Sequence, residues 1–395
     1  MKQIYILLIA LLMGLSANAE ESGTCGPDLT WHLTDNGVLT ISGKGEMDDY
    51  RFSPWQYYDI KRVIIGNRVT SIGNSAFYGC SSLTSVTIPN SVTTIKEYAF
   101  SNCSSLTSVT IGNSVTTIEK NAFDRCSSLT SVTIPNSVTT IKEYAFRGCS
   151  SLTSVTIPNS VTTIEVYAFS DCSSLTSVTI PNSVKTIGEF AFCNCSSLTS
   201  VTIGNSVTSI GMFAFCNCSS LTSVTLGNSV TTIGGDAFGL CSSLTSVTIP
   251  NSVTTIGSEA FNGCTNLQKV HIGDSVKAIG GYAFYNCTSI TQISSEAVVP
   301  PTCESGVFDG INKSKCKLIV PKNSLDAYKQ ADQWKDFSLI EGSTTGITNT
   351  VYNNSGLADV YTIDGTKRLS KASTDEINVL PKGVYIVNGK KIIIK

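Results

Sequence analysis

The chain has 395 residues, of which 14% are charged, and its formal net charge at pH 7 is −2. This balance excludes a basic field for nucleic acid and a cationic face for an anionic membrane surface. The two histidines, His32 and His271, offer little for catalysis or for metal binding by imidazole.

Residues 1–19 have the pattern of a secretory signal peptide. A basic Lys2 precedes an apolar run at residues 4–15, and the small-residue pattern Ala-Asn-Ala ends at Ala19. This run is shorter than the roughly 20 apolar residues that a membrane-spanning helix needs. We therefore expect cleavage after Ala19 and a mature protein that is secreted or held at the outer cell surface, without a transmembrane helix.

Residues 20–59 predict a β-rich N-terminal cap. The stretch LTWHL places Leu29, Trp31 and Leu33 on one side of a strand, and a DNG turn separates it from VLTIS. Alternation of this kind on both sides of a turn predicts a β-hairpin.

Residues 60–293 form an array of near-identical units. One cysteine marks each unit, at Cys80, Cys103, Cys126, Cys149, Cys172, Cys195, Cys218, Cys241, Cys264 and Cys287. The constant step of 23 residues is typical of a solenoid and too short for the four strands of a propeller blade. The sequence therefore predicts a β-rich solenoid, a leucine-rich-repeat-like array of 23-residue coils with a cap at each end.

Within a coil, the stretch LTSVTI predicts a strand that ends at Pro89 or at a glycine in the same place of other coils. VTTI predicts a second, shorter element, and the pair Ala99-Phe100 follows it. Stacked coils place like on like about 4.8 Å apart. We therefore expect ladders of Leu, Val, Ile, Phe and Cys in one continuous core.

The outward positions of the coil are the candidate binding residues. Thr84, Ser85 and Thr87 point away from the predicted core and would form long rows of hydroxyls. A more variable position carries aromatic side chains, at Tyr98, Tyr144, Tyr167, Phe190, Phe213 and Tyr282. Our hypothesis is that these aromatics set the partner preference, since aromatics favour interface centres. The alternatives are that the hydroxyls only solubilise the sheet and that the aromatics only cover the edge of the core.

The cysteine pattern favours buried core residues over disulfides or metal ligands. We expect the ladder cysteines to be buried free thiols, because parallel Cβ vectors suit a disulfide poorly. Four thiols in the Cys-Asn-Cys motifs at 193–195 and 216–218 could hold zinc, but two of them belong to the ladder, which disfavours a metal site. Cys303 and Cys316 could form a disulfide.

No catalytic motif is visible. The sequence has no Ser-His-Asp set, no phosphate-binding loop and no dinucleotide-binding turn. Outer carboxylates such as Glu97 and Asp236 are expected to be solvated charges. We expect no enzyme activity, no cofactor and no metal.

The C-terminal part breaks the repeat. Residues 294–342 are interpreted as the C-terminal cap, with a short helix from Asn323 or Ser324 through Trp334. Residues 343–350 predict a linker, and residues 351–395 predict a small module of three strands. Asn388-Gly389 within it predicts a type I′ hairpin.

The unit AFxxCSSLTSVTIPNSVTTI, repeated about ten times, resembles the BspA-like leucine-rich repeats of bacterial surface proteins. The tail is similar to the C-terminal sorting domains of type IX secretion substrates; the likeness rests on Tyr361, Asp364, Gly365, Gly383 and Tyr385. This second resemblance implies passage across the outer membrane, with the tail removed or used for surface attachment.

The BspA-like resemblance implies adhesion to host extracellular matrix proteins, for example fibronectin or fibrinogen. The leading interpretation is a non-enzymatic protein-interaction module at the cell surface. One alternative is glycan binding along the hydroxyl and aromatic rows. Another is ice binding, which is disfavoured because the ladder mixes Ser with Thr.

Overall fold

The computed structural model describes residues 20–343, 358–362, 365–373, 376–377, 380, 383–387 and 390–394. The predicted signal peptide and residues 344–350 of the predicted linker lie outside this part of the chain. The chain divides into two compact units, residues 1–320 with 324–341 and residues 321–323 with 342–395. The first is the repeat unit and the second the C-terminal unit.

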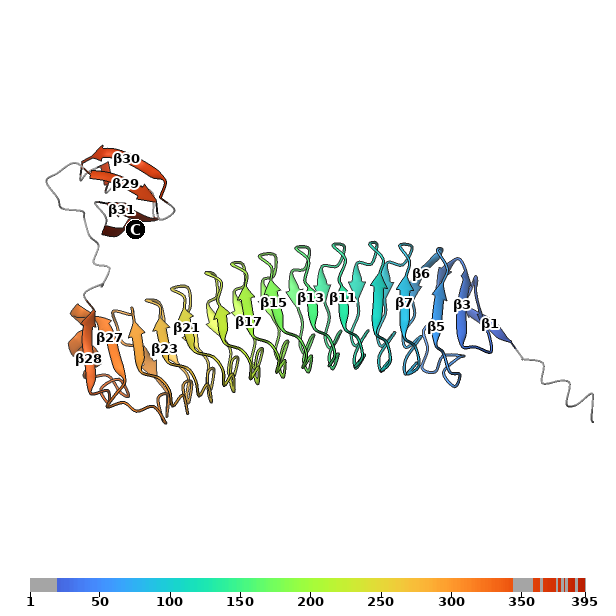
Figure 1. Cartoon of the computed structure of the whole chain (residues 1–395), viewed down its shortest axis with the longest axis horizontal. Helices are drawn as coiled ribbons and strands as arrows, with labels where there is room; N and C mark the ends of the chain where they lie inside the picture. Colours follow the sequence, from blue (N-terminus) through green and yellow to red (C-terminus); the bar gives the residue numbers. More distant parts are fainter. Residues whose placement is uncertain are drawn as a thin grey trace, which may run out of the picture. The chain divides into compact units, whose positions relative to one another are not determined.

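The repeat unit is a β-solenoid, as predicted, in which each coil contributes one strand to each of two stacks (Figure 1). The first stack, the long-strand sheet, begins with β1 (Glu21–Gly26), β2 (Leu29–Leu33), β3 (Val38–Gly43), β5 (Arg62–Ile65), β7 (Ser85–Ile88), β9 (Ser108–Ile111), β11 (Ser131–Thr133), β13 (Ser154–Thr156), β15 (Ser177–Ile180), β17 (Ser200–Ile203) and β19 (Ser223–Thr225). It is followed by a separate group with β21 (Ser246–Ile249), β23 (Lys269–Ile272), β25 (Gln292–Ser295), β27 (Lys317–Pro321) and β28 (Leu339–Ser343).

The second stack, the short-strand sheet, is made of two-residue to four-residue strands. It contains β4 (Gly45–Glu46), β6 (Val69–Ile72), β8 (Thr94–Ile95), β10 (Thr117–Ile118), β12 (Thr140–Ile141), β14 (Thr163–Ile164), β16 (Thr186–Ile187), β18 (Ser209–Ile210), β20 (Thr232–Ile233), β22 (Thr255–Ile256), β24 (Ala278–Ile279) and β26 (Thr302–Cys303).

Adjacent repeat strands pair in parallel and in exact phase with the repeat. Ser85 lies opposite Ser108 and Val86 opposite Val109 in the long-strand sheet. The turns between the sheets are also hydrogen-bonded from coil to coil; for example, the Phe100 N–H donates to the Ala122 carbonyl at 2.8 Å. Each coil is therefore held to its neighbours on every side.

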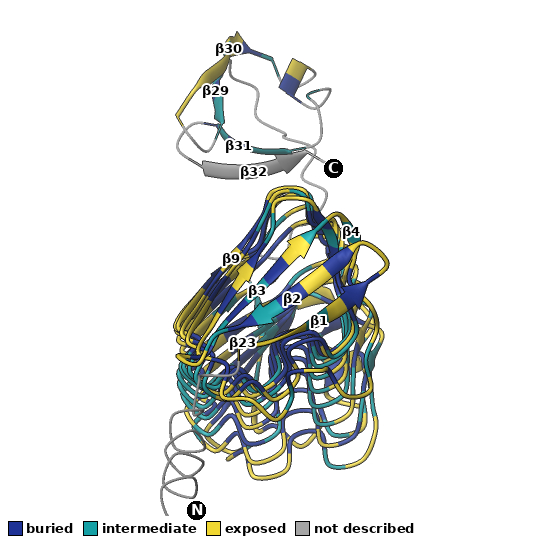
Figure 2. Cartoon of the chain, turned by 90° about the vertical axis from the view of Figure 1, so that its right-hand side faces the viewer, coloured by how far each residue is buried: buried dark blue, intermediate teal, exposed yellow. Residues whose placement is uncertain are grey.

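The core consists of the predicted ladders. Buried and exposed residues alternate along the long strands, as in β9 (Figure 2). Phe100 and Phe123 are fully buried and stack at a centroid distance of 5.3 Å with nearly parallel planes. Each ladder thiol from Cys103 to Cys287 donates a hydrogen bond to a backbone carbonyl of this phenylalanine row, as Cys126 does to Phe100 at 3.2 Å. A small apolar side chain with a weak donor is well suited to that position.

The N-terminal end is closed by antiparallel strands. The predicted hairpin is present as β2 and β3, with Trp31 opposite Ile41. β1 was not predicted and pairs with β2 on the outside. Trp55 is fully buried, stacks on Phe77, and donates from Nε1 to the Ala76 carbonyl at 2.8 Å. An aromatic lid of this kind covers the first ring of the core.

The C-terminal end has a shorter helix than predicted. A 3-10 turn, η1 (Lys322–Ser324), leads into α2 (Leu325–Tyr328), which ends well before Trp334. Ser324 makes no side-chain capping bond. Aromatic side chains cover this end of the core instead. The buried Trp334 packs edge-on against Phe308 and donates a hydrogen bond to the Pro301 carbonyl at 2.8 Å.

The described part of the C-terminal unit is a sheet in the order β30-β29-β31-β32, one strand more than predicted. The strands are β29 (Ala358–Thr362), β30 (Lys367–Ala372), β31 (Gly383–Val387) and β32 (Lys390–Ile394). Val387 lies opposite Lys390, while the predicted turn at 388–389 and Asp364 lie outside the described residues.

Candidate functional site

The outward residues of the long-strand sheet form two parallel rows, which we call the Ser–Thr face. One row holds Ser85, Ser108, Ser131, Ser154, Ser177, Ser200, Ser223 and Ser246, and the other Thr87, Thr110, Thr133, Thr156, Thr179, Thr202, Thr225 and Thr248. All sixteen are exposed, and no hydrogen bond involves their side chains in the described part of the chain. Their hydroxyls are free to bind water or a partner.

Thr84 does not share this property, although it is the same residue type one position earlier. Its Oγ1 lies 3.4 Å from the Lys61 carbonyl, and Thr107 donates in the same way to the Thr84 carbonyl at 3.0 Å. The Thr93 row repeats the arrangement on the other side of the coil, with Thr116 donating to the Thr93 carbonyl at 3.2 Å. These hydroxyls link coil to coil, so Thr84 has a structural role that Ser85 and Thr87 lack.

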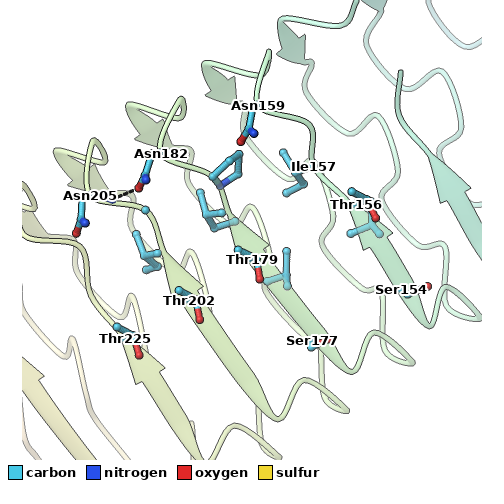
Figure 3. Close-up of a pocket in the computed structure, with 16 residues that line it drawn as sticks. Ser154, Thr156, Ile157, Asn159, Ser177, Thr179, Asn182, Thr202, Asn205 and Thr225 are labelled. Carbon is cyan, nitrogen blue, oxygen red and sulfur yellow. Dashed lines mark hydrogen bonds between the residues drawn. The ribbon is translucent and has the colours of Figure 1, made fainter. Parts of the chain in front are cut away.

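A groove runs along the C-terminal end of the long strands. We call it the Thr–Asn groove; it lies between the threonine row of the Ser–Thr face and a row of exposed asparagines, Asn67, Asn90, Asn113, Asn136, Asn159, Asn182, Asn205, Asn228 and Asn251. Figure 3 shows both rows in successive coils. Three hollows of about 720, 740 and 480 Å³ follow one another along it, within residues 67–133, 154–225 and 224–252.

Among the described residues, the asparagine N–H is hydrogen-bonded to the asparagine side chain of the preceding coil only where a glycine, and not a proline, comes before it. The Asn205 N–H donates to Asn182 Oδ1 at 2.7 Å, and Asn113 and Asn228 are bonded to the preceding coil in the same way. All three follow a glycine. A Cβ at Gly204 would lie 2.6 Å from the Pro181 carbonyl oxygen, so only glycine permits this close approach. The coils with proline make no such bond in the described chain.

The central part of the face carries no charge. Arg62 begins the serine row and Lys269 continues it after Ser246, whereas the threonine row begins at Ile64 and continues to His271. Between these ends, eight consecutive coils present uncharged side chains: the hydroxyls of the face, the amides of the groove and the apolar Ile and Pro residues that line it. Hydrogen bonds and van der Waals contact, not ion pairs, are therefore the interactions that this surface can offer.

The predicted aromatic row is only partly a stack. Tyr144, Tyr167, Phe190 and Phe213 stack face to face, with centroid distances of 4.9, 4.5 and 4.5 Å. Tyr98 and Tyr282 occupy the same position of the coil but are separated from this stack by Asn121 and by Asp236 and Glu259.

Every residue in this row has a left-handed backbone, with φ between 50° and 59° from Ser75 to Tyr282. This conformation costs a bulky residue roughly 1–2 kcal/mol. Stacking returns about 0.5–1.5 kcal/mol for each ring pair. The four stacked rings thus stabilise one another, which supports the alternative that they cover the core edge.

Two cysteines lie next to the aromatic stack. Cys193 and Cys216 are hydrogen-bonded to each other, which raises the pKa of Cys193 and lowers the pKa of Cys216. Cys195 and Cys218 of the same motifs are in the buried ladder, where Cys218 donates to the Phe192 carbonyl at 3.3 Å. The four sulfurs therefore do not converge on one point. Cys303 and Cys316 are both free thiols.

The asparagine row was missed as a candidate site from sequence. Its signal was present, because asparagine recurs with the period of the cysteines in the eight coils from Cys80 to Cys241. The sequence alone does not show that the segment after each long strand forms the wall of a groove. Among the described residues, no helix is long and apolar enough to cross a membrane.

Fold and surface together define a leucine-rich-repeat solenoid with long rows of exposed hydroxyls. A family model described as BspA type leucine-rich repeat region, in six copies, matches residues 46–176, 162–291 and 261–374. The chain belongs to this family. No enzyme family is indicated, and no curated protein matches the chain.

Solved structures of bacterial repeat proteins are similar. A leucine-rich repeat protein from Bacteroides ovatus is 26% identical, with 81% of this chain and 88% of that protein covered and a TM-score of 0.56. A leucine rich cell surface protein from Faecalibacterium prausnitzii is 30% identical over 71% of this chain and 96% of that protein, with a TM-score of 0.37.

Proposed function

We propose that this protein is a secreted or cell-surface interaction module that binds protein partners through the Ser–Thr face and the Thr–Asn groove. The observation that carries the proposal is the run of exposed hydroxyls without internal hydrogen bonds over eight consecutive coils. A partner that bonds to such groups displaces water without breaking bonds inside the solenoid. Membership of the leucine-rich-repeat family supports a binding role.

The form of the groove favours a macromolecule over a small ligand. Small-molecule sites are usually enclosed and mostly apolar with a few polar groups. Here the three hollows lie in series and share one wall of threonines and one of asparagines. A large partner can make the same contact at successive coils, so weak contacts add along the array.

Adhesion to host extracellular matrix is the form of this function that we favour. Fibronectin and fibrinogen are the matrix proteins to test first, because the resemblance to BspA-like repeats implies binding to proteins of this kind. The Faecalibacterium relative is described as a cell surface protein, which supports the same location for this chain.

We also propose that residues 1–19 direct export and that the C-terminal unit acts as a sorting domain. The separate four-stranded sheet supports a function distinct from that of the repeats. Expression of the full chain and of a variant lacking residues 351–395, followed by cell fractionation, tests this. The proposal requires the shortened protein to accumulate inside the cell envelope while the full chain reaches the surface.

The binding test uses the full chain and immobilised fibronectin, fibrinogen, collagen, mucin and glycans. The pair Thr179→Glu and Thr225→Glu places two charges in the Thr–Asn groove. The matched control, Thr186→Glu with Thr232→Glu, changes two exposed strand threonines of the short-strand sheet with the same spacing of 46 residues. We expect saturable binding to a matrix protein, at least tenfold weaker in the groove variant and unchanged in the control.

Other results would redirect the assignment. Equal weakening in both variants would mean that the groove is not the binding surface. Binding to glycans alone would favour the glycan alternative. Thermal hysteresis in a cooled solution, without binding to the panel, would favour ice.

A further inference from the structure

A single coil interrupts the aromatic row between two tyrosines. Asn121 stands where Tyr98 and Tyr144 have rings in the coils on either side. Since neighbouring rings of the row stack at 4.5–4.9 Å, the missing ring leaves space. A hollow of about 440 Å³ opens there, and we call it the ladder gap; it is lined by Tyr98, Asn121, Tyr144, Lys120, Arg125 and Arg147 among others.

The Asn121 side chain lacks an internal partner. Asn121 is 5% exposed and its Oδ1 is buried without a hydrogen bond in the described chain. A buried polar group left unpaired destabilises the fold. Asn121 lines the ladder gap, so a rotation of its amide would let a ligand there bond to this oxygen.

The cations around the ladder gap exceed the acids that neutralise them. Arg147 is bonded through Nε and Nη2 to the buried Asp124, at 2.8 and 3.0 Å. Lys120 Nζ lies 2.7 Å from Glu143 Oε2. Arg125 is exposed and has no ion pair in the described part of the chain. One guanidinium is thus available for an anion.

Hydrogen-bond donors dominate the lining in the same way. The guanidinium of Arg147 lies 4.8 Å from the centre of the Tyr144 ring, and Lys120 Nζ lies 5.6 Å from it; all three residues line the hollow. The hydroxyls of Tyr98 and Tyr144 make no hydrogen bond in the described chain. The one carboxylate in the lining, Asp124, is already taken up by Arg147.

We infer that the ladder gap is a second binding site, which takes an aspartate or glutamate side chain of a protein partner. The carboxylate would accept from Arg125 in the two-point geometry that guanidinium favours. The partner's backbone N–H would donate to the Asn121 amide oxygen. Tyrosine and arginine around a half-buried pocket are the composition of interface hot spots, which favours a protein over an acidic glycan. This site uses the turns of the coil and does not depend on the Ser–Thr face.

The test measures binding of a fluorescent Gly-Gly-Glu-Glu-Gly-Gly peptide to the full chain at low salt, with the glutamine peptide in parallel. We expect the glutamate peptide to bind at least tenfold more tightly, and Arg125→Gln to remove that preference. Arg51→Gln is the matched control, because Arg51 is also exposed, lies beside an aromatic ring, Phe52, and has no ion pair in the described chain. It should leave binding unchanged.

Two ring variants separate the ladder gap from general charge. Asn121→Tyr fills it with the residue that neighbouring coils carry at the same backbone angle, so we expect a folded protein without binding. Tyr167→Asn opens an equivalent gap away from Arg125 and should not add a site. Circular dichroism checks the fold of both.

Several outcomes would overturn the inference. These are equal binding of the two peptides, no binding of the glutamate peptide up to millimolar concentration, or full binding by Arg125→Gln or Asn121→Tyr. Hyaluronan binding tenfold more tightly than the peptide, with the same dependence on Arg125, would assign the site to acidic glycans instead.

Discussion

Arg147 donates two hydrogen bonds to the Asp124 carboxylate of the preceding coil, and the Asp124 side chain is 6% exposed. Ser101 and Ser170 stand at the same position in the flanking coils. Asp124 and Arg147 therefore place an ion pair at a coil position where the flanking coils fold with serine.

Arg147→Ser should destabilise the protein by about 3 kcal/mol, because it leaves a buried carboxylate unpaired. Urea unfolding followed by circular dichroism measures this. The double variant Asp124→Ser/Arg147→Ser imitates the flanking coils, and we expect it to recover most of the loss. An equal loss in the single and double variants would mean that the arginine acts by packing alone.

Asp236 and Glu259 put two carboxylates in consecutive coils of the aromatic row. Burial and, secondarily, the charge of Glu259 raise the pKa of Asp236 to about 6. A carboxyl group whose native pKa is raised above its ordinary value of 3.8 opposes folding when ionised. The penalty is full above pH 6 and disappears as the pH falls below 3.8.

Asp236→Asn should therefore stabilise the protein at pH 7.5, by less than about 1 kcal/mol because solvent screens the site. The gain should vanish at pH 3.5. Glu189→Gln, at an exposed carboxylate of the same surface, is the control. The midpoints of urea unfolding at both pH values measure this. A stabilisation by Asp236→Asn that persists at pH 3.5 would show that it does not come from the ionised Asp236 carboxylate.

The thiols should differ in reactivity. Burial raises the pKa of the ladder cysteines, such as Cys149 and Cys172, whereas the hydrogen bond from Cys193 lowers the pKa of the half-exposed Cys216. The thiolate is the reactive form. Brief alkylation of the native protein with iodoacetamide, read by mass spectrometry, should modify Cys216 first. Cys216→Ser should lose that fast label, and urea should expose the rest.

The C-terminal unit should be acid-sensitive through Asp359. Hydrogen bonds from Lys367 Nζ at 2.6 Å and from the Lys371 N–H at 2.9 Å lower the pKa of Asp359 to about 2. Because the native pKa is depressed, this stabilisation is complete above pH 3.8 and is lost as the pH falls through 2. Hydrogen exchange of β29 and β30 should show the loss at pH 2, and Asp359→Asn should show it already at pH 5.

The core of the solenoid follows directly from the periodic sequence. Positions such as Phe100 and Cys103 recur with one spacing, and in-register stacking then dictates their contacts. The difference between Thr84 and Thr87 could not be predicted in this way. Both are outward threonines, and which hydroxyl reaches a carbonyl depends on where the backbone of the preceding coil lies.

The left-handed backbone conformation at the aromatic row could not be predicted from the sequence either. No glycine or asparagine marks the turn at Tyr98, so nothing local signals a positive φ. The ladder gap illustrates the reverse case. Asn121 is the residue best suited to that backbone, yet in sequence it looks like one more variable position.

The hydrogen bonds between coils join residues a fixed number of positions apart, most often 23, as in Thr107 to Thr84. Excising or duplicating 23 residues within the central array therefore gives every remaining coil the kind of neighbour it already had. A change of length by whole coils thus preserves the register of both sheets. The array can therefore lengthen or shorten by whole coils, which changes the number of exposed hydroxyls in each row and leaves their spacing the same.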